Sequence, residues 1–424
     1  MPLPEYFIKK NFTPKINEKP PEGLNICVVV PSYNETGLDK SLDSLAKCTL
    51  PKNSVEVIVV VNHPEGSASK TIEQSEQSIR TVEKFNHQHK NTKRKFYAIP
   101  ALDLPRKQAG VGLARQIGMD EAAHRLSQTG SSDGIIACFD ADATCMSNYL
   151  VELEKLWSNY PLTAACAIRY EHPLTGNEYP RNVYEGIAAY ELHLRYYNQA
   201  SRFVNFPFSY HTVGSSMACL ASTYIRFGGM NRRQAGEDFY FLQKIIPHGN
   251  FRELNSTCIF PSPRPSNRVP FGTGRAMTKF LENTGAGIQT YNLKSFLDLV
   301  PLFEAVDDFW VMDELRVNAR IGNLPTPLSL FLNDNNARDQ ILRVRSNTAN
   351  QRSFRKRFFL WFDAFMLLKY LNFTGEKYYP RQPVNTQAIQ LGKLLGIAVN
   401  NDSPIADLLN LYRIKGMEDW NFKF

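Results

Sequence analysis

The sequence predicts an α/β fold, in which a mainly parallel β-sheet is flanked by helices and followed by a helical C-terminal region. From Asn25 onward, short runs of β-branched residues alternate with amphipathic stretches, a pattern typical of helices that cross a parallel sheet. Beyond about Arg275 the strand signals stop, and Gly, Pro and Asn residues separate helical stretches. We therefore expect an N-terminal extension over residues 1–24, an α/β domain over 25–275 and a helical region over 276–424.

Each short apolar run of the α/β domain is expected to form a strand. In order, these runs cover residues 26–30, 55–61, 96–99, 135–139, 163–168, 216–220 and 257–260. Helical spacing or good helix formers mark residues 38–45, 112–126, 150–156, 183–198 and 238–246 between them, with Ser147 as the expected N-cap of the third helix. The Pro-rich segment 261–270 fits neither a helix interior nor a central strand.

The composition is that of a folded protein. A hydrophobic content of 43% and a charged content of 21% over 424 residues exclude a disordered or fibrous chain. The 49 basic and 41 acidic side chains leave a net charge of +8, which favours anionic partners such as nucleotides, phosphorylated lipids or nucleic acid. Charge alone does not choose among these classes.

The cysteines and the apolar segments bear on location. The seven cysteines are odd in number, have no C-x-x-C spacing and in several cases lie inside apolar runs, so we expect reduced thiols, no zinc site and a cytoplasmic protein. The first twenty residues contain no apolar signal region. The longest apolar cluster, 358–368, is interrupted by Asp363 and is too short to span a bilayer. Contact with a membrane is therefore expected to be peripheral at most.

Asp140 and Asp142 directly follow the apolar strand expected at 135–139. Two carboxylates at positions i and i+2 point to the same side of a strand, so together they can hold one hard cation such as Mg²⁺ or Mn²⁺. In an open α/β sheet, ligands bind outside the carboxyl ends of the strands, where this pair falls. The alternative is a solvated turn with an Asp at a helix cap.

Two further motifs give this pair a context. After the first strand, Pro31 ends the ladder, Tyr33 offers a stacking face, and Asn34 and Glu35 could hold a ribose or a base edge. Much later in the chain, the adjacent carboxylates of residues 237–238 open a helix. Taken alone, those carboxylates could simply stabilise the helix N-terminus.

In their order and spacing, these motifs resemble the family 2 glycosyltransferases of the GT-A fold, over roughly residues 25–275. The family pattern of P-x-Y-N-E, D-x-D, a Gly-Gly turn and an E-D pair is met by residues 31–35, 140–142, 228–229 and 237–238. Residues 107–118 look like the family's G-x-x-x-A-R-N-x-G helix, with Gln116 in place of the usual Asn. The resemblance implies a Rossmann-like GT-A sheet and a catalytic role for the 25–275 domain.

The sequence departs from the family pattern in two places. The second strand ends in Asn62 where the family usually has an Asp that reads the base, so Asn62 is the candidate for contact with a uracil or guanine edge. The segment after residue 258 lacks the histidine that many relatives bring to the metal. There, Arg264 and Arg268 could supply positive charge to a diphosphate, helped by backbone N–H groups of Gly272 and Thr273 at a helix start. The alternative is a basic surface loop.

The resemblance implies an inverting, metal-dependent transfer of a sugar from a UDP- or GDP-sugar to a glycan or lipid-linked acceptor. Asp140 and Asp142 would position Mg²⁺ or Mn²⁺ on the donor diphosphate, and Arg115 is also expected among the residues that bind the donor. The general base is expected to be Asp238, with Glu237 in reserve. Nucleic acid is not an expected partner. Two other classes stay open, a sugar nucleotidyltransferase and a catalytically silent nucleotide- or carbohydrate-binding module.

A basic and aromatic stretch lies in the helical region. Arg352, Arg355, Lys356 and Arg357 precede the aromatic residues of 358–362, as in a helix that lies on a membrane surface. The apolar residues surround this helix instead of forming one stripe, which favours burial in a helical core. Peripheral contact with the cytoplasmic face of a membrane is the alternative.

Overall fold

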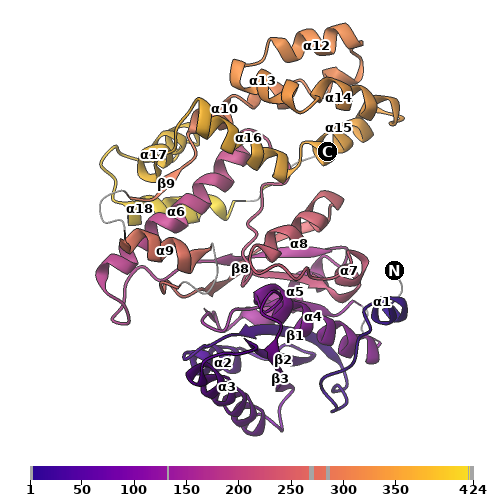
Figure 1. Ribbon diagram of the computed structural model, residues 1–424, viewed down its shortest axis with the longest axis vertical. Coiled ribbons are helices and arrows are strands. Elements are labelled where there is room, and N and C mark those ends of the chain that lie inside the picture. The colour runs from indigo at the N-terminus through magenta and orange to yellow at the C-terminus, as the bar shows by residue number, and fades with distance from the viewer. Residues whose placement is uncertain (1–2, 131–132, 267–271, 283–286, 419, 421–424) are drawn as a thin grey trace. The chain divides into compact units, whose positions relative to one another are not determined.

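The computed structural model describes residues 3–130, 133–266, 272–282, 287–418 and 420. The chain divides into two units, the first made of Met1–Pro173 and Thr212–Ala276, and the second of Leu174–His211 and Met277–Phe424. The second unit therefore includes Leu174–His211, which lies inside the segment expected to be the α/β domain. The domain limits expected from the sequence, at residues 24, 275 and 276, stay a prediction. Figure 1 labels the elements along the chain.

The first unit is built on an eight-stranded sheet, with the strand order β3-β2-β1-β4-β7-β6-β8-β5. Strand β1 pairs in parallel with β2 and β4, β2 pairs in parallel with β3, and β6 pairs in parallel with β8. Strand β7 is antiparallel to both β4 and β6, and β5 is antiparallel to β8. The predicted fold class, a mainly parallel sheet flanked by helices with a helical C-terminal region, is confirmed. The strands are β1 (Leu24–Ser32), β2 (Ser54–Pro64), β3 (Arg94–Leu104), β4 (Ile135–Cys138), β5 (Thr144–Cys145), β6 (Ala165–Tyr170), β7 (Met217–Leu220) and β8 (Phe251–Phe260).

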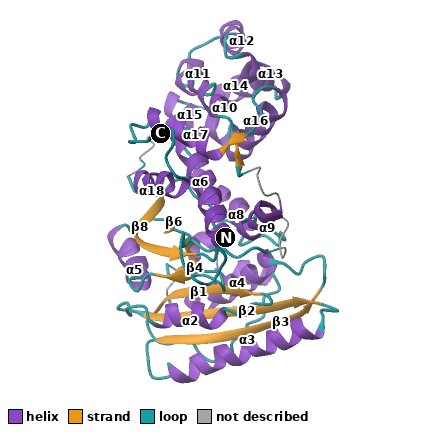
Figure 2. Cartoon of the chain, turned by 90° about the vertical axis from the view of Figure 1, so that its left-hand side faces the viewer, coloured by secondary structure: helices purple, strands orange, loops and turns teal. Residues whose placement is uncertain are grey.

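Helices cover both faces of this sheet. Successive side chains of a strand point to opposite faces, and in β1 and β2 apolar side chains are buried on both of them. Ile26, Val28 and Val30 of β1 share a hydrophobic core with leucines and valines of α2, α3 and α5. On the opposite face, Gly118 of α4 lies so close that an added Cβ would be 2.4 Å from Val29. In Figure 2, β1, β2 and β3 run side by side and α3 lies along β3. The helices are α1 (Leu3–Lys9), α2 (Leu38–Ala46), α3 (Ser69–Gln88), α4 (Val111–Gln128), α5 (Tyr149–Asn159), α7 (Ala221–Arg226) and α8 (Glu237–Ile245).

Two local predictions in this unit were wrong. Ser147 was expected to cap α5, but the helix begins at Tyr149 and its N-cap position is Asn148, without a side-chain cap. The Asn148 side chain instead forms hydrogen bonds with Ser256 and Thr257 of β8. Strand β1 was expected to stop at Pro31, but it continues to Ser32. Pro31 is tolerated because β4 pairs with β1 only as far as Val29, so no ladder bond to β4 is lost there.

The N-terminal segment packs on α4. The Tyr6 hydroxyl donates to the Asp120 carboxylate at 2.7 Å, and the backbone N–H groups of Lys15 and Ile16 donate to Glu121. These carboxylates are largely buried on α4, so hydrogen bonds are needed to offset the cost of burying them. The segment before β1 thereby holds the helix that carries Arg115.

The second unit is helical, except that β9 (Gln289–Thr290) pairs with β10 (Gln382–Pro383), two short strands in a region where none was expected. Phe354, Phe358 and Phe359 of α15 are fully buried, as the core interpretation of that helix predicts. Among the described residues, no helix combines the length and the apolar character needed to cross a bilayer. The helices are α6 (Arg181–Phe203), α10 (Leu293–Leu297), α11 (Val300–Glu304), α12 (Glu314–Gly322), α13 (Thr326–Asp334), α14 (Ala337–Ser346), α15 (Gln351–Trp361), α16 (Ala364–Lys377), α17 (Val384–Leu394) and α18 (Ile405–Gly416), while α9 (Thr273–Glu282) begins in the first unit.

Candidate active site

The carboxyl ends of β1, β2 and β4 bring several of the predicted site residues to one edge of the sheet. These three strands are parallel, so their carboxyl ends meet at the same edge. Glu35 follows β1, Asn62 lies near the end of β2, and Asp140 and Asp142 follow β4. The N–H of Ala143 donates to the carbonyl of Asp140 at 3.0 Å, which closes a turn that carries both carboxylates. The sequence thus folds its D-x-D motif into a tight turn at the edge where ligands bind in such sheets.

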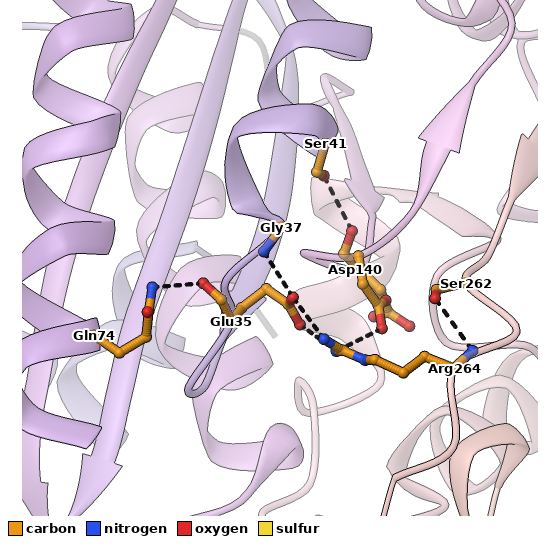
Figure 3. A network of polar contacts seen from close by, with 8 residues as sticks. Glu35, Gly37, Ser41, Gln74, Asp140, Ser262 and Arg264 are labelled. Atoms are coloured by element: carbon orange, nitrogen blue, oxygen red, sulfur yellow. Dashed lines mark hydrogen bonds and ion pairs between the residues drawn. The ribbon is translucent and has the colours of Figure 1, made fainter. Parts of the chain in front are cut away.

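An ion pair joins the segment after β1 to the segment after β8 (Figure 3). The two terminal nitrogens of Arg264 donate to the Glu35 carboxylate at 3.0 and 2.6 Å, and Nη2 also lies 3.2 Å from Oδ2 of Asp142. Glu35 is 2% exposed, and its Oε1 accepts a further bond from the N–H of Gly37 at 3.0 Å. Bidentate pairing of this kind fixes the direction of the guanidinium. Arg264 is therefore held beside Asp142 from a distant part of the chain.

Ser41 and Gln74 brace this network, although no sequence motif marks either residue. The Ser41 hydroxyl donates to the backbone carbonyl of Asp140 at 3.3 Å, and Nε2 of Gln74 donates to the backbone carbonyl of Glu35 at 2.8 Å (Figure 3). Both side chains act on backbone atoms, which every residue carries. Such contacts leave no recognisable pattern in a single sequence.

A second buried arginine links the D-x-D turn to α8. Nη2 of Arg115 donates to Asp140 at 2.5 Å, and Nη1 donates to Glu237. The Arg115 side chain is 4% exposed and that of Glu237 is 2% exposed. Burial opposes the charged form of Arg115, but the neighbouring Asp140 and Glu237 carboxylates more than offset it and raise its pKa. Arg115, at the start of α4, thus connects two motifs that lie far apart in the sequence.

Two glycines allow the backbone to lie close to Arg115 and its helix. A Cβ added at Gly214 would lie 2.5 Å from Nη1 of Arg115, and one added at Gly112 would lie 2.2 Å from the carbonyl oxygen of Arg233. Neither distance is tolerated without a shift of the neighbouring group. The two glycines therefore let the chain before β7 and the chain before α8 close over α4.

Asp238 occupies the second position of α8, next to the buried Glu237. Its Oδ1 accepts the N–H of Phe239 at 2.7 Å, and its side chain is half-buried. Burial raises the pKa of Asp238 to about 7, and the negative charge of Glu237 acts in the same direction, while Arg115 lowers it. A carboxyl group with a pKa near neutrality can accept a proton efficiently at that pH.

The turn before α8 is held by polar side chains. Gly236 has a φ of +71°, which favours glycine, and Nδ2 of Asn231 donates to the carbonyl of Glu237 at 3.1 Å. Nε of Arg232 donates to Gln116 at 2.8 Å, so the side chain at the position where the family usually has Asn ties α4 to this turn. No motif in the sequence predicts this bond of Gln116.

The remaining predicted residues are only partly brought together. Tyr33 is half-buried and Asn62 is buried. Tyr33 follows Ser32 of β1, Asn62 follows Val61 of β2, and Ser32 pairs with Val61, so Tyr33 and Asn62 lie at neighbouring strand ends. Thr273 begins α9 after the exposed Gly272, and the carbonyl of Gly274 accepts the N–H of Ser266. Arg268 lies outside the described residues. The contacts predicted for these residues with a nucleotide stay predictions.

Asp140 and Asp142 provide a donor set that fits a hard cation. Their side chains are 36% and 28% exposed, and each places one oxygen against an arginine. Mg²⁺ is commonly bound by one or two carboxylates together with phosphate oxygens and water. Within the described ranges, no group of three or more His, Cys, Asp or Glu side chains is arranged to hold a metal. The fit therefore rests on two carboxylates, with other ligands to come from substrate and solvent.

Residues 27–218 match the family described as Glycosyl transferase family 2. The chain contains a family 2 glycosyltransferase domain. The matched segment begins within β1 and ends within β7, and it includes Glu35, Arg115, Asp140 and Asp142, while the E-D pair of α8 follows it. The predicted family is therefore confirmed, and so is the enzyme class, a glycosyltransferase.

Several solved structures resemble this glycosyltransferase chain. Crystal structures of S. aureus TarS 1–349 in complex with UDP-GlcNAc and with UDP are 16% and 14% identical to it, with TM-scores of 0.38 and 0.39. The alignments cover 92% of this chain and 89% of TarS in the first, and 80% and 92% in the second. No curated protein matches the chain.

Proposed function

We propose that the chain transfers a sugar from a UDP- or GDP-sugar to an acceptor hydroxyl, with inversion at the anomeric carbon. The observation that carries this proposal is the chain of ion pairs Asp140–Arg115–Glu237, in which the buried Arg115 joins the D-x-D turn to the E-D pair. The family 2 glycosyltransferase domain supports the reaction class. Asp238 directly follows Glu237 in the sequence, so it lies next to the carboxylate that Arg115 joins to Asp140.

Binding of the donor is proposed at the ends of β1 and β2. Tyr33 can stack on the base, and the amide of Asn62 can pair with a uracil or guanine edge. Asp140 and Asp142 would hold Mg²⁺ or Mn²⁺, which when bound supplies positive charge to the diphosphate leaving group. Arg264 adds a fixed positive charge beside Asp142, because Glu35 holds its guanidinium in a bidentate pair.

Asp238 is the proposed general base. It would accept the proton of the acceptor hydroxyl as that oxygen attacks the anomeric carbon and the nucleoside diphosphate leaves. Its pKa of about 7 supports this role. Glu237 fits the role less well, because its carboxylate is buried and engaged by Arg115. The proposed function of Glu237 is to position Arg115, and through it Asp140.

The proposed acceptor is a glycan or a lipid-linked glycan, and the proposed location is the cytoplasm or the cytoplasmic face of a membrane, where the enzyme would serve glycan biosynthesis. The net charge of +8 supports an anionic acceptor such as a lipid-linked glycan, and the cysteines inside the apolar runs support a location in which thiols stay reduced.

Titration calorimetry with UDP and GDP, each with and without manganese, tests the donor site. We expect one of the two nucleotides to bind in a manganese-dependent manner, because the diphosphate and the two carboxylates share the cation. Manganese-independent binding of both nucleotides with equal affinity would contradict the proposed donor site.

The rate of transfer should rise with pH through neutrality. The base is active as the carboxylate, so below a pKa of about 7 the rate at saturating donor should fall about tenfold per pH unit, and above it the rate should level off. In Glu237→Gln, a negative charge that raises the pKa of Asp238 is removed, so the acid limb should move to lower pH. An unchanged rate between pH 5 and 8 in the parent would exclude Asp238 as the titrating base.

A further inference from the structure

Two thiols from distant parts of the first unit are in contact beside the proposed active site. The Sγ atoms of Cys48, just after α2, and Cys145, in β5, are 3.6 Å apart. Cys48 is 3% exposed and Cys145 is half-buried, so the pair can be reached from the side of Cys145. A disulfide requires a sulfur separation of about 2.05 Å, so the two atoms need to approach by about 1.5 Å. The other five cysteines, at positions 27, 138, 166, 219 and 258, are all buried.

The surroundings of the pair favour reaction of Cys48. A hydrogen bond from the Cys145 thiol lowers the pKa of Cys48, and the charge of Arg94 acts in the same direction. The Arg94 guanidinium is fixed there because it donates to the carbonyl groups of Leu45 and Cys48 at 2.7 and 3.0 Å. A thiolate, not a thiol, is the nucleophile in cysteine oxidation. The pair thus combines a stabilised nucleophile with a second sulfur in contact.

The pair is connected to the proposed donor site on two sides. On one side, α2 carries Ser41, whose hydroxyl donates to the carbonyl of Asp140. On the other side, Cys145 follows the D-x-D turn by three residues and pairs with Ile259 of β8, which leads to Arg264. A covalent bond between the segment just after α2 and β5 would therefore pull on both segments that flank the two carboxylates.

We propose that Cys48 and Cys145 form a reversible disulfide in the presence of a peroxide, and that this bond weakens binding of a nucleoside diphosphate. The Cys48 thiolate attacks the O–O bond of hydrogen peroxide and becomes a sulfenic acid, with release of hydroxide, which takes up a proton to give water. The Cys145 sulfur then attacks the sulfenic sulfur, forms the S–S bond and releases a second water. In sum, two thiols are oxidised and one peroxide is reduced to two waters.

Mass spectrometry of the full chain tests the covalent step without any assay of function. After treatment with hydrogen peroxide, the parent should lose two hydrogen atoms, and peptide mapping should place the bond between Cys48 and Cys145. Dithiothreitol should reverse it. The variants Cys48→Ser and Cys145→Ser, which keep side chains of nearly the same size, should not form the bond. A parent chain that keeps both thiols, or that forms a bond between other cysteines, would overturn the proposal.

The second part rests on the proposed function and is tested by calorimetry with UDP or GDP and manganese. Coupling between sites is typically 5- to 150-fold, so oxidised parent should bind at least about fivefold more weakly than reduced parent, while peroxide-treated Cys48→Ser should bind as its untreated form does. Unchanged affinity after disulfide formation would overturn this second part. If the reduced parent binds neither nucleotide, the proposed function fails, whereas the mass measurement still decides the disulfide.

Discussion

Replacing Asp238 with Asn should lower the rate of glycosyl transfer by roughly two to four orders of magnitude, the usual size of general-base catalysis. The substitution keeps the shape of the side chain and an oxygen that can accept the N–H of Phe239, but the amide cannot take up the acceptor proton. Affinity for the donor nucleotide should be nearly unchanged, because the proposed donor contacts come from other residues. The measurements are kcat with a true acceptor and the Kd of the nucleotide.

Glu237→Gln is the matched comparison, since it also removes one negative charge at the start of α8. The sequence predicts similar effects of the two substitutions on folding, but Glu237 is buried against Arg115, whereas Asp238 is half-buried. A glutamine keeps one acceptor for Arg115 without the charge, so thermal unfolding should show a loss of about 1–3 kcal/mol for Glu237→Gln and less for Asp238→Asn. If Glu237→Gln loses chemistry while Asp238→Asn keeps near-parental turnover, the base is Glu237.

Asp142→Ala should abolish manganese-dependent binding of the nucleoside diphosphate, because two carboxylates are the protein's whole proposed contribution to the cation. It also removes a partner of Arg264, which keeps its bidentate pair with Glu35. The fold should therefore survive. Calorimetry with and without manganese measures the effect directly.

Asp39→Ala is the control for Asp142→Ala, since Asp39 is an exposed carboxylate on α2 of the same unit. Asp39→Ala should bind the nucleotide with the affinity of the parent chain, both with and without manganese. Equal affinity of Asp142→Ala and the parent in the presence of manganese would show that Asp142 is not a ligand of the ion.

Much of the sheet could be predicted from sequence because its signal is local. The strands β1, β2 and β4 are short apolar runs, and their burial on both faces follows from helices that cross on both sides. The two-residue strands β9 and β10 could not be predicted, since a pair of residues carries no periodicity. The cap of α5 was missed because the Asn148 side chain bonds to β8, more than a hundred residues away.

In the candidate site too, local motifs could be predicted from sequence and long-range contacts could not. The D-x-D turn and the E-D pair were predicted as separate motifs, and their order in the chain pointed to the family. That Arg115 joins Asp140 to Glu237, and that Arg264 joins Glu35 to Asp142, could not be derived, because those pairs form only when five distant segments meet. The same holds for the contact between Cys48 and Cys145.

The central claim is tested most directly by incubating the full chain with a panel of UDP- and GDP-sugars, manganese and a mixture of glycan acceptors, and quantifying the nucleotides by chromatography. We predict that at least one sugar nucleotide yields its nucleoside diphosphate, that the yield depends on manganese, and that Asp238→Asn yields roughly a hundredfold less. Release of pyrophosphate from a nucleoside triphosphate and a sugar phosphate would indicate a nucleotidyltransferase instead. Binding of a nucleotide without any turnover across the panel would contradict the account and indicate a silent binding module.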